Sequence, residues 1–217
     1  RFWGTRGSIA SAGPGTVRYG GNTSCVEVEA EGELLVFDAG TGIRPLGDAL
    51  VAQSRAARGH LLITHTHWDH IQGFPFFQPL FQSGNQWDVY APRGFGASLR
   101  ETLAGQMQYT YFPVTLDALG ANLRFHDLLE GEFRIGRARI TAHFLNPPAL
   151  TLGYRVEAGG RTLAYITDHE CHARSAALGR PLGALLRPEP LEGRDEAHRR
   201  FVQGADLLIH DAQYLAE

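Results

Sequence analysis

The 217-residue sequence contains no lysine, so all 20 of its basic residues are arginine. The 23 acidic residues leave a formal net charge of -3, and this excludes the strongly basic surface that binds nucleic acid through bulk charge. Composition therefore does not favour nucleic acid as a partner. Arginine can still form paired hydrogen bonds with phosphate or carboxylate, so a local anion site stays open.

Cysteine and long apolar runs are also scarce. Two cysteines, Cys25 and Cys171, are too few for a disulfide framework, which predicts a reducing compartment and a cytoplasmic location. No apolar run approaches the ~18 residues of a membrane span, and the first residues lack the apolar centre of a signal peptide. Cys25 is expected to pack as a small hydrophobe, and Cys171 lacks a second cysteine for a metal site.

Short apolar runs broken by glycine, proline, asparagine and aspartate predict alternating strands and helices. In the first half, strands are expected at 24–30, 33–40, 60–64 and 88–92, and helices at 43–57 and 96–107. In the second half, a run of strands is expected between 121 and 168, followed by a helix at 195–205 and a strand at 206–212. This order predicts an α/β chain with two mixed sheets packed face to face and helices outside them.

The segment HTHWDH (65–70) follows a short apolar strand and contains four metal-ligand residue types. Imidazole nitrogens and carboxylate oxygens together suit zinc, iron or manganese. Alternate positions after a strand point to the same side, so His65 and His67 can share one metal. Asp69 and His70, after the turn, can reach a second metal. A solvated histidine-rich loop is the alternative, but this spacing after a buried strand favours a metal site.

The pattern H-x-H-x-D-H at the end of a strand resembles the metallo-β-lactamase superfamily, and the resemblance covers nearly the whole chain. It rests on ordered segments that include GTRGS, YGGNTSCVEV, LLVFDAGTGIRPLG, LITHTHWDHIQGFPFF, TLGYRVE, YITDHE and ADLLIHDAQY. These look like a bacterial branch related to ribonuclease Z and to phosphoribosyl cyclic phosphodiesterases. The resemblance implies a four-layer αββα sandwich with a two-metal site at one edge of the strands.

The resemblance also implies a role for each matching residue. The implied metal ligands are His65 and His67 for the first ion, Asp69 and His70 for the second ion, and Asp168 as the carboxylate that bridges both.

Two further residues receive roles around the metals. Asp38 in FDAGTG resembles a residue that hydrogen-bonds a ligand histidine and fixes its tautomer; the alternative is a turn aspartate before Gly-Thr-Gly. Asp69 could also orient the attacking water. His210 resembles a residue near the site and is the candidate proton donor to the leaving group. His169 and His172 are weaker candidates, and each of these histidines could equally be a solvated loop residue.

Two positions depart from the family pattern. A first-metal histidine is expected seven residues before the tyrosine of GY, where this sequence has Pro147. The nearest preceding histidine, His143, would lie about 13 Å away along an extended strand and is expected to be an ordinary strand residue. Relatives also continue into a helix and a strand with another histidine, whereas this chain stops at Glu217. A single domain over 1–217 that lacks these two elements is therefore expected.

The expected function is hydrolysis of a phosphodiester by a metal-bound hydroxide, with one or two zinc ions, or manganese or iron. A small phosphodiester is favoured over RNA, because the chain lacks the Gly- and Lys-rich arm that the resemblance associates with ribonuclease Z. Two alternatives stay open: a hydrolase of a carboxylic ester, lactone or thioester, and a degenerate metal-binding or redox protein with an incomplete first metal site. A homo-oligomer is also left open.

Aromatic residues are dense in IQGFPFFQPLF (71–81) and MQYTYFPV (107–114). They predict either a wall over the substrate or core packing beneath the metal-binding loop. We expect Phe74 and Phe77 in the core, and the pattern leaves Tyr109 and Tyr111 open.

Overall fold

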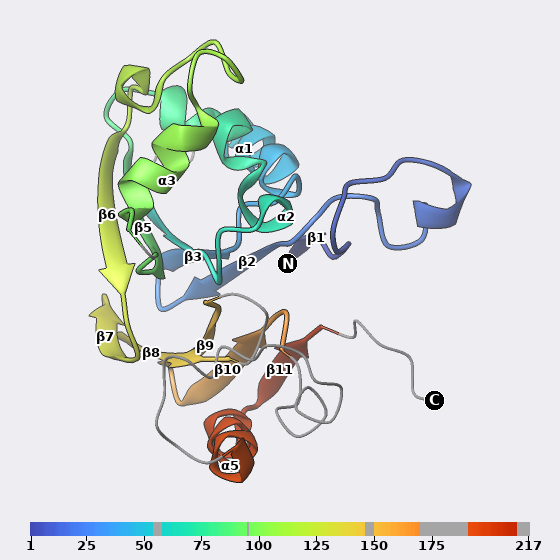
Figure 1. The fold of residues 1–217 in the computed structure, drawn as a ribbon, viewed down its shortest axis with the longest axis vertical. Coiled ribbons are helices and arrows are strands. Elements are labelled where there is room, and N and C mark those ends of the chain that lie inside the picture. Colours follow the sequence, from blue (N-terminus) through green and yellow to red (C-terminus); the bar gives the residue numbers. More distant parts are fainter. Residues whose placement is uncertain (54–57, 95, 146–149, 170–190, 212–217) are drawn as a thin grey trace. The chain divides into compact units, whose positions relative to one another are not determined.

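The computed structural model describes residues 1–53, 58–94, 96–145, 150–169 and 191–211. The chain divides into two compact units, Arg1–Leu128 and Leu129–Glu217, and each contains one sheet (Figure 1). The prediction of two mixed sheets with helices is confirmed. Within the described ranges, every helix is too short or too polar to cross a membrane.

The sheet of the first unit has six strands in the order in which they follow one another along the chain. They are β1 (Phe2–Gly4), β2 (Cys25–Ala30), β3 (Glu33–Phe37), β4 (Arg58–Leu62), β5 (Gln86–Pro92) and β6 (Asn122–Leu128). The first three pair antiparallel, and β3 to β6 pair parallel. The continuous apolar runs of β3 and β5 are typical of such buried parallel strands. Because β3 and β4 are parallel neighbours, the residues that follow them meet at one edge of the sheet.

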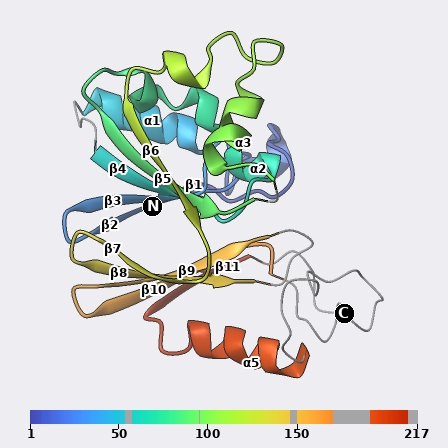
Figure 2. The ribbon, with the colours of Figure 1, turned by 60° about the vertical axis from the view of Figure 1, so that its left-hand side comes forward.

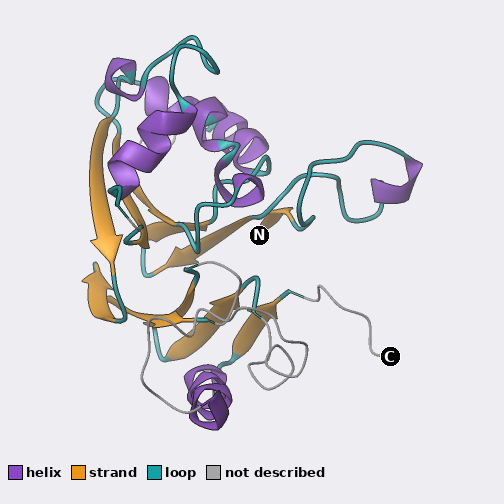
Figure 3. Ribbon diagram, viewed as in Figure 1, coloured by secondary structure: helices purple, strands orange, loops and turns teal. Residues whose placement is uncertain are grey.

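Helices and 3-10 turns cover one face of this sheet (Figure 3). They are α1 (Ile43–Ala52), α2 (Trp68–Ile71), η2 (Phe74–Phe76), η3 (Gln78–Phe81), α3 (Leu99–Gln106) and η4 (Leu116–Ala118), whereas η1 (Pro14–Thr16) lies in the loop between β1 and β2 and buries no residue. Helix α1 buries one face, formed by Ile43, Leu46 and Leu50 at helical spacing. Helix α3 begins at a capping box between Ser98 and Glu101.

The aromatic segment after α2 contributes to the core as predicted. The side chains of Phe74 and Phe77 are both 0% exposed, and the Phe77 ring packs edge-on against Trp87 of β5 at 4.8 Å. Tyr109 and Tyr111, by contrast, are exposed to solvent. Phe74 and Phe77 thus pack in the core next to the HTHWDH segment, whereas Tyr109 and Tyr111 do not contribute to the core. Cys25 is fully buried, as expected of a small apolar residue.

The second unit contains a five-stranded sheet in the order β11-β10-β9-β8-β7. Its elements are β7 (Gly131–Ile135), β8 (Ala138–Phe144), β9 (Leu152–Ala158), β10 (Arg161–Ile166), α5 (Leu191–Val202) and β11 (Leu207–His210). Only β10 and β11 among these neighbours pair parallel. Helix α5 lies on one face of this sheet (Figure 2). It begins earlier than the predicted residue 195, since a single internal glycine, Gly193, does not stop a helix.

Candidate metal centre

An aspartate follows β3 at the edge where β3 and β4 end together. The backbone N–H of Asp38 donates to the carbonyl of Leu62, the last residue of β4, at 3.1 Å. Asp38 is 0% exposed, and its φ of 60° is a left-handed conformation that non-glycine residues rarely adopt. Such strain persists only where the surroundings hold it, and it clusters at functional sites. The local geometry therefore marks Asp38 as a candidate functional position.

The Asp38 carboxylate accepts hydrogen bonds on both oxygens. Oδ1 accepts from the backbone N–H of Thr64 at 2.7 Å and from its hydroxyl at 2.9 Å. Oδ2 accepts from Nδ1 of His70 at 2.9 Å. His70 therefore carries its proton on Nδ1, and Nε2 becomes the nitrogen that can bind a metal. This Nε2 lies 3.6 Å from Oδ2 of Asp69. The contact between Asp38 and a candidate ligand histidine is the one that the sequence predicts.

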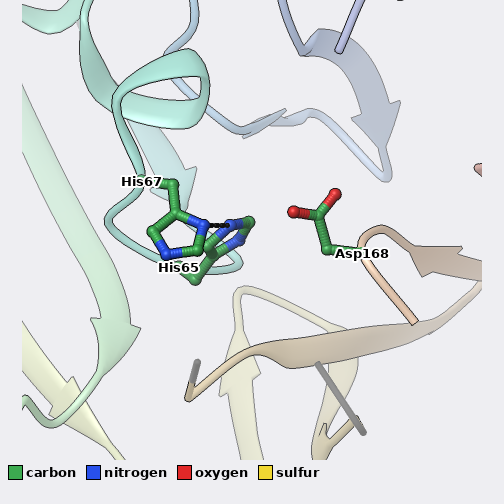
Figure 4. Close-up of side chains that lie close together, drawn as sticks. All are labelled: His65, His67 and Asp168. Carbon is green, nitrogen blue, oxygen red and sulfur yellow. Dashed lines mark hydrogen bonds between the residues drawn. The ribbon is translucent and has the colours of Figure 1, made fainter. Parts of the chain in front are cut away.

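Thr64 extends the same network to His65. Because the Thr64 hydroxyl donates its proton to Asp38, it accepts from Nδ1 of His65 at 3.1 Å. The second ring nitrogen of His65, Nε2, then lies 2.9 Å from Nδ1 of His67 (Figure 4). Two imidazole nitrogens at this distance require a shared proton or a shared cation between them. Both buried histidines thus direct Nε2 toward the candidate metal centre.

The four ligand candidates of HTHWDH lie together in the first unit. His65 and His70 are buried at 1% and 2% exposure, and His67 is exposed. The carboxylate of Asp69 is held by a residue distant in the sequence, because the backbone N–H of Ser8 donates to its Oδ2 at 2.8 Å. Three imidazole nitrogens and one carboxylate oxygen form a donor set that suits zinc, manganese or iron. The residues present therefore fit a metal ion.

Asp168, the predicted bridging carboxylate, belongs to the second unit and follows β10. Its backbone N–H donates to Oδ2 of Asp211 at 2.9 Å, and the N–H of Asp211 donates to the carbonyl of Ile166 at 3.1 Å. Like Asp38, it has a left-handed backbone, with a φ of 53°. Figure 4 draws its side chain beyond the end of the strand. Asp211 was not predicted, and its only signal in the sequence is its position at the end of the strand parallel to β10.

His210 is held by the residue that follows it. Its Nδ1–H donates to the carbonyl of Asp211 at 2.7 Å, and its side chain is 33% exposed. The hydrogen bond to the Asp211 side chain raises the pKa of His210. His169 stacks on His198 of α5, with ring centroids 3.7 Å apart, and both rings lie 6.0 Å from His210. No pattern in the sequence indicates that His198 joins this histidine cluster.

The remaining sequence candidates are strand or loop residues. His143 lies on β8 with Nδ1 2.6 Å from Oε1 of Glu130, as expected of an ordinary strand histidine. Pro147, Cys171 and His172 lie outside the residues that the structure describes.

Burial, together with the neighbouring His169 and His210, lowers the pKa of His198 to about 3. A histidine in the unfolded chain has a pKa near 6.5. As the pH falls, His198 is therefore protonated in the unfolded state before it is protonated in the folded state. The neutral His198 ring therefore makes its full contribution to the stability of the folded state above about pH 6.5, and this contribution is lost as the pH falls from there toward 3. We expect His198→Asn to lose less unfolding free energy than the wild type between pH 7 and pH 5, measured by urea unfolding. Equal losses in the two proteins would contradict this assignment.

Comparison with known proteins places the chain in a family. Residues 34–217 match the family model described as the beta-lactamase superfamily domain. Ribonuclease Z of Haloarcula marismortui is 26% identical over 98% of this chain and 73% of its own length. Ribonuclease Z of Natronomonas pharaonis is 28% identical over 100% of this chain and 75% of its own length.

Solved structures agree on the fold. The short form of human tRNase Z is 21% identical and covers 98% of this chain and 77% of its own, with a TM-score of 0.63. Zinc-bound PqqB of Methylobacterium extorquens is 20% identical and covers 87% of this chain and 60% of its own, with a TM-score of 0.53. The predicted metallo-β-lactamase fold is confirmed by these matches.

Proposed function

Since this chain belongs to the beta-lactamase superfamily and is a hydrolase of the metallo-β-lactamase fold, we propose that it cleaves a phosphodiester with one or two bound metal ions. The observation that carries the proposal is the donor set of HTHWDH. Asp38, through direct and Thr64-mediated hydrogen bonds, orients His70 and His65 so that each offers Nε2.

The proposed ligands are those that the resemblance to the metallo-β-lactamase superfamily implies. His65 and His67 would hold the first ion and Asp69 and His70 the second, and Asp168 is proposed as a carboxylate ligand that both ions would share. The strained backbone of Asp168, fixed by the carboxylate of Asp211, supports this role. Zinc is proposed, with manganese or iron as alternatives. A bound zinc ion lowers the pKa of its water to near neutrality and polarises a phosphoryl oxygen.

Two side chains are proposed to move or hold protons. Asp69 is fixed by the N–H of Ser8, so its carboxylate can orient the attacking water or accept its proton. His210 is proposed to protonate the leaving oxygen. The contact with Asp211 that raises its pKa keeps it protonated closer to neutral pH, as a general acid requires.

The names of the relatives bear on the substrate. The two relatives described above are named ribonuclease Z, and this conflicts in part with the expectation that nucleic acid is not a partner. A net charge of -3 describes the whole surface and does not exclude local arginines at a binding site. We therefore propose a phosphodiester substrate that includes RNA, in place of the small phosphodiester favoured by composition alone. A cytoplasmic location stays a prediction.

The proposed function predicts hydrolysis of bis-p-nitrophenyl phosphate that stops after chelation and returns on addition of zinc or manganese. The physical reason is that hydroxide at neutral pH depends on the metal. The measurement is release of p-nitrophenol beside two carbonyl controls, p-nitrophenyl acetate and a chromogenic cephalosporin. Turnover of a carbonyl substrate alone would favour the ester alternative. Protein that binds no zinc and shows no turnover would favour the degenerate alternative. A labelled RNA in the same assay tests whether the substrate extends to nucleic acid.

A further inference from the structure

We infer that Trp68 stacks on the base of a nucleotide substrate, and that it selects a phosphodiester that carries a base over one that does not. This inference rests on the proposed function and deepens it. Trp68 lies inside HTHWDH, between His67 and Asp69, yet its side chain is 76% exposed. Trp68 and Thr66 are the two residues of the motif to which the proposed hydrolysis gives no role, and Trp68 is the aromatic one.

The exposure of Trp68 does not arise from a loosely held loop. The carbonyl of Trp68 accepts from the N–H of Gln72 at 2.7 Å, and that of His70 accepts from Ala39 at 2.7 Å. Packing against the neighbouring loop is so close that a Cβ added at Gly40 would lie 2.3 Å from the carbonyl oxygen of Asp69. A rigid helix therefore presents the indole to solvent. An indole held exposed beside a candidate reaction centre offers its flat apolar face to a bound ligand.

The position of Trp68 suits a base beside the reacting phosphate. Its Cα is about 3.8 Å along the chain from each of the Cα atoms of His67 and Asp69, which are candidate ligands of different ions. In a nucleotide only the sugar separates the base from the phosphate. A phosphate held at the metal centre thus brings the base within reach of the indole, and a flat aromatic face binds any base by stacking.

The turn after α3 carries two further exposed aromatic residues. Tyr109 and Tyr111 in this turn are 81% and 75% exposed. The turn is anchored near α2, because the Phe112 ring packs edge-on against Phe76 at 5.3 Å. The end of α3 is tied to α2 as well, since a side-chain amide of Gln106 donates to the carbonyl of Ile71 at 3.3 Å. Figure 2 shows α2 and α3 on the same side of the sheet. The two exposed tyrosines therefore belong to a turn that is linked to the segment containing Trp68.

Positive charge lies near the same segment. The loop between β1 and β2 contacts the centre through Ser8, whose N–H donates to Asp69. Two residues earlier, the exposed Arg6 is held by a hydrogen bond from its Nε to the carbonyl of Ile9 at 2.9 Å. A guanidinium group here complements the phosphate of a nucleotide. Aromatic faces combined with a cation match a nucleotide better than they match a purely apolar partner.

The test compares the binding of AMP and ribose 5-phosphate to the zinc-loaded protein by calorimetry. These two probes share the phosphate and the sugar and differ in the base. A stacked base is expected to make AMP bind about 5- to 150-fold more tightly. Trp68→Ala should bring this ratio close to one, and Trp68→Phe should keep most of it. Phe2→Ala, which removes another exposed aromatic from the same unit, should leave the ratio unchanged.

The outcomes separate this inference from the proposed function. An AMP preference that persists in Trp68→Ala, or a wild type that binds neither probe or both equally, would overturn the inference. Failure of the proposed function would appear differently, as absence of phosphodiester hydrolysis with the preference for AMP intact. If sedimentation equilibrium shows that Trp68→Ala lowers the molecular mass in solution, a second copy covers the indole, and the base-stacking role is wrong.

Discussion

Replacing His67 with alanine is expected to lower phosphodiester hydrolysis by more than about 100-fold without unfolding the metal-free protein. Loss of a residue that only supports a metal ligand typically costs 10- to 100-fold, so loss of a ligand should cost more. His67 is exposed, and its Nδ1 lies 2.9 Å from Nε2 of His65. The substitution therefore removes a donor atom and leaves the core unchanged.

Three measurements check this result. Metal analysis should show fewer ions per chain, the hydrolysis assay should show the loss of rate, and thermal unfolding after chelation should match the wild type. The matched control is His126→Ala, which removes a histidine of β6 that contacts Asp88 at 2.8 Å within the same unit. The control should keep both metal and activity. An unchanged metal content in His67→Ala would show that the ligand assignment is wrong.

The ligand cluster of the first unit could be predicted because its geometry is local. Four candidates fall within six residues after one strand, and Asp38 directly follows the preceding strand of the chain. Parallel pairing of β3 with β4 brings these two strand ends together. The periodicity of side chains along a strand and the identity of the residues were sufficient to predict the HTHWDH candidates, whereas the role of Asp38 was implied by the resemblance to the family.

Contacts across long sequence separations could not be predicted in this way. Ser8 donates its backbone N–H to the carboxylate of Asp69, and Asp168 donates its backbone N–H to the carboxylate of Asp211; any residue type except proline would supply such a donor. The sequence therefore does not indicate which backbone N–H group forms such a contact. The left-handed backbone of Asp38 and Asp168 is equally hidden, since a glycine would have signalled such a conformation and an aspartate does not.

The sequence did not predict which sheet contains residues 122–128. Because this segment is followed closely by the strands of the second half, the sequence pattern predicts that it belongs with them. Residues 122–128 instead form β6, which pairs parallel with β5 in the first sheet. Alternation of apolar and polar residues predicts that a segment is a strand, but it does not specify the neighbour to which its backbone bonds. Here the parallel crossover through α3 decides the pairing.

Asp38→Ala and Asp38→Asn are expected to separate stability from metal affinity. In Asp38→Ala, the backbone N–H of Thr64 and Nδ1–H of His70 lose a buried acceptor. Each such loss costs about 1–3 kcal/mol, so the unfolding free energy of the metal-free protein should fall by about 3 kcal/mol. Asp38→Asn keeps the shape and one oxygen for Thr64, and its cost in stability should be smaller.

The asparagine variant tests the tautomer. With its amide oxygen facing Thr64, its amide N–H group faces Nδ1 of His70, which must then accept a hydrogen bond and carry its proton on Nε2. That nitrogen can no longer bind a metal, so zinc affinity should fall by about 10- to 100-fold although the fold is kept. Calorimetric titration with zinc, beside urea unfolding in chelator, measures both quantities. Asp48→Asn, an exposed substitution on α1, is the control. If Asp38 served only the turn, Asp38→Asn would bind zinc as the control does.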